Sequence, residues 1–334
     1  MLSVVALLLP AAISAAAADK PPTGPAPLIS TVAQRLRRLG NVSATYRDVI
    51  DSRATINPRL WKLLQEKMRR KYGLLLGPES HGRYVSARRF SYLHGCALYQ
   101  FRLLPQTIAK VPPLTIGDWK VIKTYTPERS ESLRYALHGK FPIGGIEARD
   151  SLPWSVMDVA LGLRGAGSDH WLRPSDVKKM QLMRLAGGSF TLAQDNRGAY
   201  DYRWTFRQKP HLELVSVAAS MKGKQLIAIR CSNFRNVDGL WLPEHIKETS
   251  RPLGYGRRIS QTVSITHVVY TVGSRWNTPN RYLILFPQGS AVLDERIGQS
   301  FRIESRPRRL TDKAIFHLLV KWDGGWHKKG GPHR

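Results

Sequence analysis

Cysteine is scarce in this chain of 334 residues, which contains only two. Two thiols are too few for a disulfide-rich mini-domain or for a zinc site with four thiolate ligands. The 27 glycines and 21 prolines follow no fixed period, which excludes a collagen-like structure and predicts many turns. Because 42% of the residues are hydrophobic, the chain is able to bury a core, and its length allows one large domain or two average ones.

Acidic residues are also few, since 24 Asp and Glu stand against 52 Lys and Arg and give a formal net charge of +28. The basic residues are spread along the chain, whereas a nucleic-acid module concentrates them on one face. We therefore expect no specific nucleic acid as a partner. A charge of this size nevertheless favours anionic membrane surfaces and other polyanions.

A long run without charge occurs only at the N-terminus, from Met1 to Ala18. Its last residues, Ala15–Ala18, are the small residues that a signal peptidase needs. We interpret residues 1–18 as an export signal, with the mature chain beginning within Ala15–Lys20. An uncleaved membrane anchor is the alternative, which Pro10 and the short length disfavour. The protein is expected to be exported, and soluble in the periplasm or outside the cell.

Export leaves two alternatives open for Cys96 and Cys231. In an oxidising compartment they form one long-loop disulfide if their strands are neighbours in space. Otherwise each is a small buried hydrophobic residue without a partner.

The first part of the chain predicts a tether and two helices. Residues 19–29 are rich in proline and predict an extended tether. A short helix is expected over Thr31–Leu39 and a strand over Val42–Ile50. A basic amphipathic helix follows as an insertion near residues 57–77; its charged face either touches a membrane or is simply solvated.

The rest of the chain is a pattern of strands and tight turns. Turns are predicted at His94-Gly95, Lys222-Gly223, Asp238-Gly239 and Pro287-Gln288-Gly289. Short connections indicate an antiparallel meander, because parallel neighbours need longer crossovers. We place one domain over residues 30–305 and a basic C-terminal tail over residues 306–334.

Motifs of catalysis are missing from the sequence: it has no phosphate-binding loop, no H-E-x-x-H and no G-x-S-x-G. Gly167–His170 contains serine, aspartate and histidine in a row, but a triad requires side chains that meet, so this segment is interpreted as a loop. Asp294 and Glu295 are adjacent and would point to opposite faces of a strand. We expect no enzymatic activity, no metal and no cofactor, with a hydrolase of unrecognised triad as a weaker alternative.

Three stretches of the second half carry a family resemblance: NFRNVDGLWLPEHIKE (Asn233–Glu248), ITHVVYTV (Ile265–Val272) and LFPQGSAVLDERIGQSFRI (Leu285–Ile303). Together with the early order of helix and strand, they resemble the LolA/LolB-like outer-membrane lipoprotein-sorting superfamily, in particular its large exported bacterial members. The insertion near 57–77, the long region Leu152–Gly188 and the positive charge depart from that pattern.

The resemblance implies a mainly β (α+β) fold, in which a curved antiparallel half-barrel sheet is covered by a few helices. It also implies a non-enzymatic carrier or sensor that binds a lipid or the acyl chains of a lipoprotein in an apolar cavity. Strand alternation supplies five candidate cavity residues, namely Ile227, Ile229, Val263, Ile265 and Val269. The alternative is that these residues are packed core and that the protein docks on polyanions without a ligand cavity.

Overall fold

The computed structural model describes residues 25–56, 79–104, 108–109, 120–135, 142–147, 155–166, 168, 170–195, 200–208, 210–251, 253–254, 257–275, 278–304, 306–315 and 318. The predicted export signal, the start of the tether and the helical insertion near 57–77 lie outside these residues.

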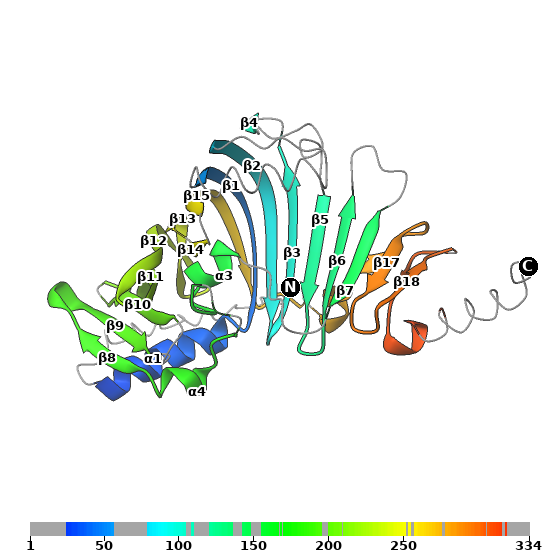
Figure 1. The fold of residues 1–334 in the computed structure, drawn as a ribbon. Coiled ribbons are helices and arrows are strands. Elements are labelled where there is room, and N and C mark those ends of the chain that lie inside the picture. The colour runs from blue at the N-terminus through cyan, green and yellow to red at the C-terminus, as the bar shows by residue number, and fades with distance from the viewer. Residues whose placement is uncertain are drawn as a thin grey trace, which may run out of the picture.

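In this part of the chain, seventeen strands form one curved sheet, which runs from β8 at one end to β18 at the other (Figure 1). The principal strands, in their order across the sheet, are β8 (Gln181–Arg184), β9 (Ser189–Gln194), β10 (Asp201–Arg207), β11 (Glu213–Met221), β12 (Lys224–Val237), β13 (Leu240–Ser250), β15 (Arg257–Val272), β1 (Asn41–Ile56), β2 (Glu79–Leu93), β3 (Cys96–Leu103), β5 (Lys120–Tyr125), β6 (Ser130–Tyr135), β7 (Ile143–Glu147), β17 (Ala291–Asp294) and β18 (Gln299–Arg302).

Two short strands extend this sheet, β4 (Ile108–Ala109) beside β2 and β14 (Leu253–Gly254) beside β15. Every pairing in the described sheet is antiparallel except the pairing of β7 with β17, which is parallel. The predicted fold class, a mainly β, curved antiparallel sheet with few helices, is confirmed.

The predicted two-residue turns join neighbouring strands as expected. His94-Gly95 joins β2 to β3, Lys222-Gly223 joins β11 to β12, and Asp238-Gly239 joins β12 to β13. At the last of these, Asp238 has a φ of 49° and Gly239 a φ of 76°, the left-handed pair that a tight hairpin requires.

A β-bulge in β15 corrects one prediction made from strand alternation. Thr45 pairs with Val269 but Arg47 pairs with Thr266, so β15 has an extra residue opposite Tyr46, and His267 there has a φ of 55°. The extra residue reverses which side chains face the core. Val263 and Ile265 are buried before the bulge, whereas Val269 after it is 59% exposed, so its predicted inward orientation is wrong.

Helix α1 (Pro25–Arg38) begins earlier than predicted. Leu28, Val32 and Leu36 lie four residues apart on one face and are buried against the sheet. This packing draws residues 25–29 into the helix, so the prediction of an extended tether is wrong for those residues.

Helix α3 (Val156–Ala160) lies inside the curve of the sheet (Figure 1). The Oγ of Ser155 accepts a hydrogen bond from Met157 N at 3.2 Å and caps the helix N-terminus. All five helical residues are buried, and the helix contacts β11, β12 and β13. A short helix α4 (Pro174–Val177) follows and contacts α1; the 3₁₀ turns are η2 (Ala186–Gly188) and η3 (Pro279–Tyr282).

A second hydrophobic core lies beneath β6, β7, β17 and β18 and includes residues of the predicted tail. Strand β16 (Leu285–Phe286) pairs with β19 (Arg308–Arg309), and Leu310 and Ile315 are buried in this core. The buried guanidinium of Arg129 holds the segment by contacts with Asp312 at 3.0 Å and with the carbonyl of Leu310. The folded domain therefore extends beyond residue 305, the boundary predicted from the sequence.

Candidate functional site

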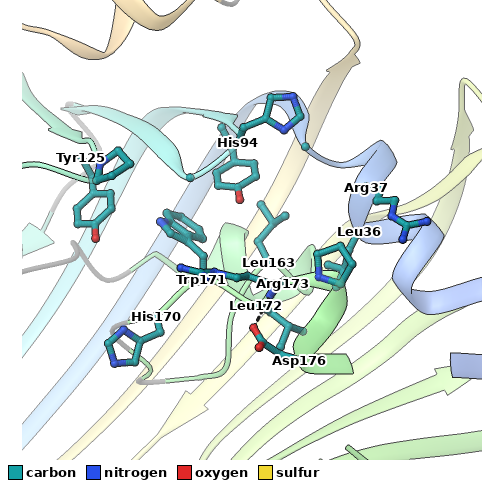
Figure 2. A pocket seen from close by; sticks show the side chains of 15 residues that line it. Leu36, Arg37, His94, Tyr125, Leu163, His170, Trp171, Leu172, Arg173 and Asp176 are labelled. Atoms are coloured by element: carbon teal, nitrogen blue, oxygen red, sulfur yellow. Dashed lines mark hydrogen bonds between the residues drawn. The ribbon is translucent and has the colours of Figure 1, made fainter. Parts of the chain in front are cut away.

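A cavity of about 680 Å³ lies where four segments from distant parts of the sequence meet. These are the C-terminal end of α1, the β2–β3 turn, the β5–β6 turn and the segment between α3 and α4 (Figure 2). Volumes between about 300 and 1,000 Å³ are typical of small-molecule sites.

The floor and one wall of the cavity are apolar and aromatic. Leu36, Tyr92, Tyr125 and Leu163 are buried at its base. The indole of Trp171 lies in the middle of the site in Figure 2, with its ring centroid 4.7 Å from that of Tyr92 and 6.3 Å from that of Tyr125. Burial raises the pKa of Tyr92 to about 12, so its hydroxyl stays protonated and uncharged at neutral pH.

The rim of the cavity is made of basic residues. Arg37, His94, His170 and Arg173 contribute exposed side chains to the lining. Asp176 is the one carboxylate among the described lining residues, and its Oδ2 accepts a hydrogen bond from Arg173 N at 2.8 Å. The cavity thus offers a hydrophobic interior beneath a basic rim that contains two arginines, Arg37 and Arg173.

The imidazole of His94 reaches the rim because Gly40 leaves room for it. A Cβ atom added to Gly40 would lie 2.7 Å from Cε1 of His94, closer than real Cβ contacts allow. The backbone N–H of His94 also donates to the Gly40 carbonyl at 2.8 Å. This contact fixes the β2–β3 turn against the end of α1 and so defines one side of the opening.

A buried ion pair supports the cavity wall from behind. Nη2 of Arg164 lies 3.0 Å from Oδ2 of Asp158, with side-chain exposures of 1% and 0%, and the Tyr99 hydroxyl donates to the same Oδ2 at 2.7 Å. The Arg164 guanidinium also lies over the Trp171 ring, 5.8 Å from its centroid. Burial raises the pKa of Asp158 above its ordinary value, an effect that Arg164 and Tyr99 oppose.

The five residues predicted to line a ligand cavity lie elsewhere. Ile229, Val263 and Ile265 are buried in the core, Ile227 packs at its edge, and Val269 faces outward. None of the five lines the cavity of Figure 2. Helix α3 packs against β11, β12 and β13, so over β12 it occupies the space in which an acyl chain was predicted from the sequence.

The two cysteines are both free, so the disulfide alternative does not hold in this structure. Cys96 begins β3 and Cys231 lies in β12, and the strands between them are β13, β15, β1 and β2. Neighbouring strands are about 4.8 Å apart, whereas disulfide-bonded Cα atoms are within about 7 Å. Cys231 is buried, which raises the pKa of its thiol to about 12 and keeps it protonated.

Of the segment with three triad residue types, the structure describes Ser168 and His170. The Ser168 hydroxyl donates to the His170 carbonyl at 3.2 Å and accepts from His170 N at 3.1 Å, so it bonds the backbone rather than an imidazole. Asp294 is fully buried and paired with Arg296, whereas Glu295 is exposed. Among the described residues, His, Cys, Asp and Glu form no cluster of three suited to a metal ion. Within the same residues, no helix has both the length and the apolar character needed to cross a membrane.

Comparisons with known proteins find similarity in structure only. No protein-family model and no curated protein matches the sequence. One similar structure is a DUF1329 family protein from Desulfovibrio piger, with a TM-score of 0.36 and 11% identity, covering 78% of this chain and 100% of that one. Another is a LolA superfamily protein from Nitrosomonas europaea, with a TM-score of 0.31 and 9% identity, covering 72% and 92%. The second bears the name of the superfamily that the sequence resembles.

Proposed function

We propose that this protein is an exported, non-enzymatic carrier or sensor that binds an amphiphile, such as a lipid or an acylated protein, in the cavity of Figure 2. The observation that carries the proposal is the division of that cavity into an aromatic and aliphatic floor and a basic rim with two arginines. The acyl chain would lie against Tyr92, Tyr125 and Trp171, and an anionic head group would lie near Arg37 and Arg173.

Two physical effects favour such a ligand. Burying an apolar chain gains about 25 cal/mol for each Å² of apolar surface removed from water. Exposed arginines at the rim add a charge-assisted contact to a carboxylate or phosphate without the cost of burying an ion. An uncharged chain of the same length would have the first effect only, so we expect anionic amphiphiles to be preferred.

Organic extraction and mass spectrometry of the natively purified protein test the proposal directly, with co-purified lipid as the expected result. Titration with a fluorescent fatty acid should then be saturable. Leu172→Gln, in the cavity wall, is expected to weaken binding several-fold, whereas Leu185→Gln changes a side chain that is 48% exposed and does not line the cavity. Equal affinity for both variants, or no saturable binding by the wild type, would contradict the proposal.

The head-group contact has its own test. The double variant Arg37→Gln/Arg173→Gln should reduce the affinity for a fatty acid more than the affinity for the corresponding fatty alcohol. An equal reduction in affinity for both ligands would show that the two arginines do not bind the head group. The proposal for the apolar floor would then still stand.

A further inference from the structure

A second concave region, of about 660 Å³, lies on the opposite face of the sheet, across β11, β12, β13 and β15. One row of polar side chains crosses it from strand to strand: Ser216 is paired with Arg230, Arg230 with Lys247, and Lys247 with Ser264. Ile229 and Ile246 of the same strands are buried on the core side, which confirms that the row faces away from the core. We call this region the outer groove.

The outer groove places like charges directly opposite each other. Arg230 and Lys247 are cross-strand partners and both are exposed. Like charges in that position destabilise a sheet. Neither side chain forms an ion pair with any residue that the structure describes, and no carboxylate is among the described residues that line the groove. Repulsion that the protein leaves uncompensated can be relieved by an anion from outside.

The other polar residues of the lining suit oxyanions, while Val215, Cys231, Ile246 and Ile265 complete the lining as apolar residues. The next row contributes Ser232 and His245, which are paired with each other, and Thr266, which is paired with the exposed Arg47. Serine and threonine hydroxyls donate hydrogen bonds to phosphate oxygens, and the cations supply the opposite charge. The described lining residues include no Phe, Tyr or Trp, so the imidazole of His245 is the one ring among them on which a nucleic-acid base would stack.

We propose that the outer groove binds the phosphate groups of anionic phospholipids and docks the protein on a membrane surface. This inference does not depend on the cavity of Figure 2, because the two regions lie on different faces of the sheet and share no lining residue. The overall charge of +28 does not say which surface would contact a membrane, whereas this proposal assigns that contact to β11, β12, β13 and β15.

Sedimentation with lipid vesicles tests the proposal. The wild-type protein should bind vesicles of phosphatidylcholine and phosphatidylglycerol (3:1), with an affinity that falls as salt is added, and should not bind phosphatidylcholine alone. The double variant Arg230→Gln/Lys247→Gln removes the facing cations. Each basic residue near an anionic surface contributes about a fivefold change in affinity, so the variant should bind at least tenfold more weakly.

The matched control is Lys178→Gln/Lys179→Gln, which removes the same charge from an exposed site outside the groove. Its affinity should fall less than threefold. A similar fall in both variants would show general attraction and overturn the proposal. The proposal would also be overturned if the wild type bound single-stranded DNA more tightly than the vesicles and Arg230→Gln/Lys247→Gln lost that binding.

The thermal stability of Lys247→Gln provides a second test. Because Lys247→Gln relieves the repulsion with Arg230, its melting temperature at low salt should equal or exceed that of the wild type. A lower melting temperature would mean that Lys247 has a stabilising partner and would contradict the argument from uncompensated charge.

Discussion

Replacing the buried ion pair behind the cavity gives the sharpest test of the structure. Asp158→Leu removes the carboxylate that lies 3.0 Å from the Arg164 guanidinium, whose side chain is 1% exposed. Removing one partner of a buried pair costs about 3–5 kcal/mol, and the Tyr99 hydroxyl loses its acceptor at a further cost of about 1 kcal/mol or more. For a domain of this size, at about 1.5–2 °C for each kcal/mol, the melting temperature should fall by at least about 6 °C.

The double variant Asp158→Leu/Arg164→Met supplies the control. Replacing both ions by apolar side chains of similar volume is often close to neutral, so the double variant should be at least about 2 kcal/mol more stable than Asp158→Leu. Denaturant unfolding of the wild type, both single variants and the double variant measures the coupling energy. Strictly additive effects would refute the assignment of a direct ion pair.

The pH dependence of Arg164→Met adds an independent readout. Burial raises the pKa of Asp158, and loss of Arg164 removes the largest of the effects that lower it. A carboxyl group with a raised pKa binds its proton more tightly in the folded state, so folding stability declines as the pH rises from the unfolded pKa through the folded one. The variant should therefore be more stable, relative to the wild type, at pH 4 than at pH 8.

Local sequence signals were sufficient for the strands and turns of the second half. Each predicted X-Gly hairpin turn is determined by two adjacent residues whose backbone must adopt positive φ, and such information is contained in the sequence itself. Alternation also placed Ile229 and Ile265 correctly on the buried face. It failed at Val269, because the bulge at His267 follows from the pairing with β1 and has no local signature in ITHVV.

The cavity was beyond the reach of sequence patterns. Its apolar part joins Leu36, Tyr92, Tyr125 and Trp171, which come from one helix, two strands and one loop far apart in the chain. The apolar run around Val156–Leu163 was a detectable signal of a buried element, but its position inside the curve of the sheet depends on long-range packing. Acyl-chain binding was therefore assigned to a sheet face that the protein covers with its own helix.

The remaining predictions concern a turn, an ionic contact and a core position. Gly289 has a φ of 83° and Ser290 N donates to the Pro287 carbonyl at 3.2 Å, as in a type II turn, so Gly289→Val should lower the unfolding free energy by about 1 kcal/mol or more in a thermal melt. Arg129→Met removes the guanidinium that lies 2.6 Å from the buried Glu131 and that contacts Asp312 and the Leu310 carbonyl beside β19. Trypsin should therefore cleave the segment around β19 faster than in the wild type, and unchanged cleavage would contradict this anchoring role.

The last prediction compares two neighbours in β12. Ile229 is 0% exposed in the core beneath α3, so Ile229→Glu must either bury an unpartnered carboxylate or expel the helix, at a cost of several kcal/mol. Ala228 faces the opposite side, where Ala228→Glu lies near exposed Arg230 and should change stability by about 0.5 kcal/mol or less. Circular dichroism melts of both variants decide the matter before any ligand is added. Were Ile229→Glu to melt at the wild-type temperature and lose only fatty-acid binding, the acyl chain would lie against β12 after all, and the position of α3 described above would be wrong.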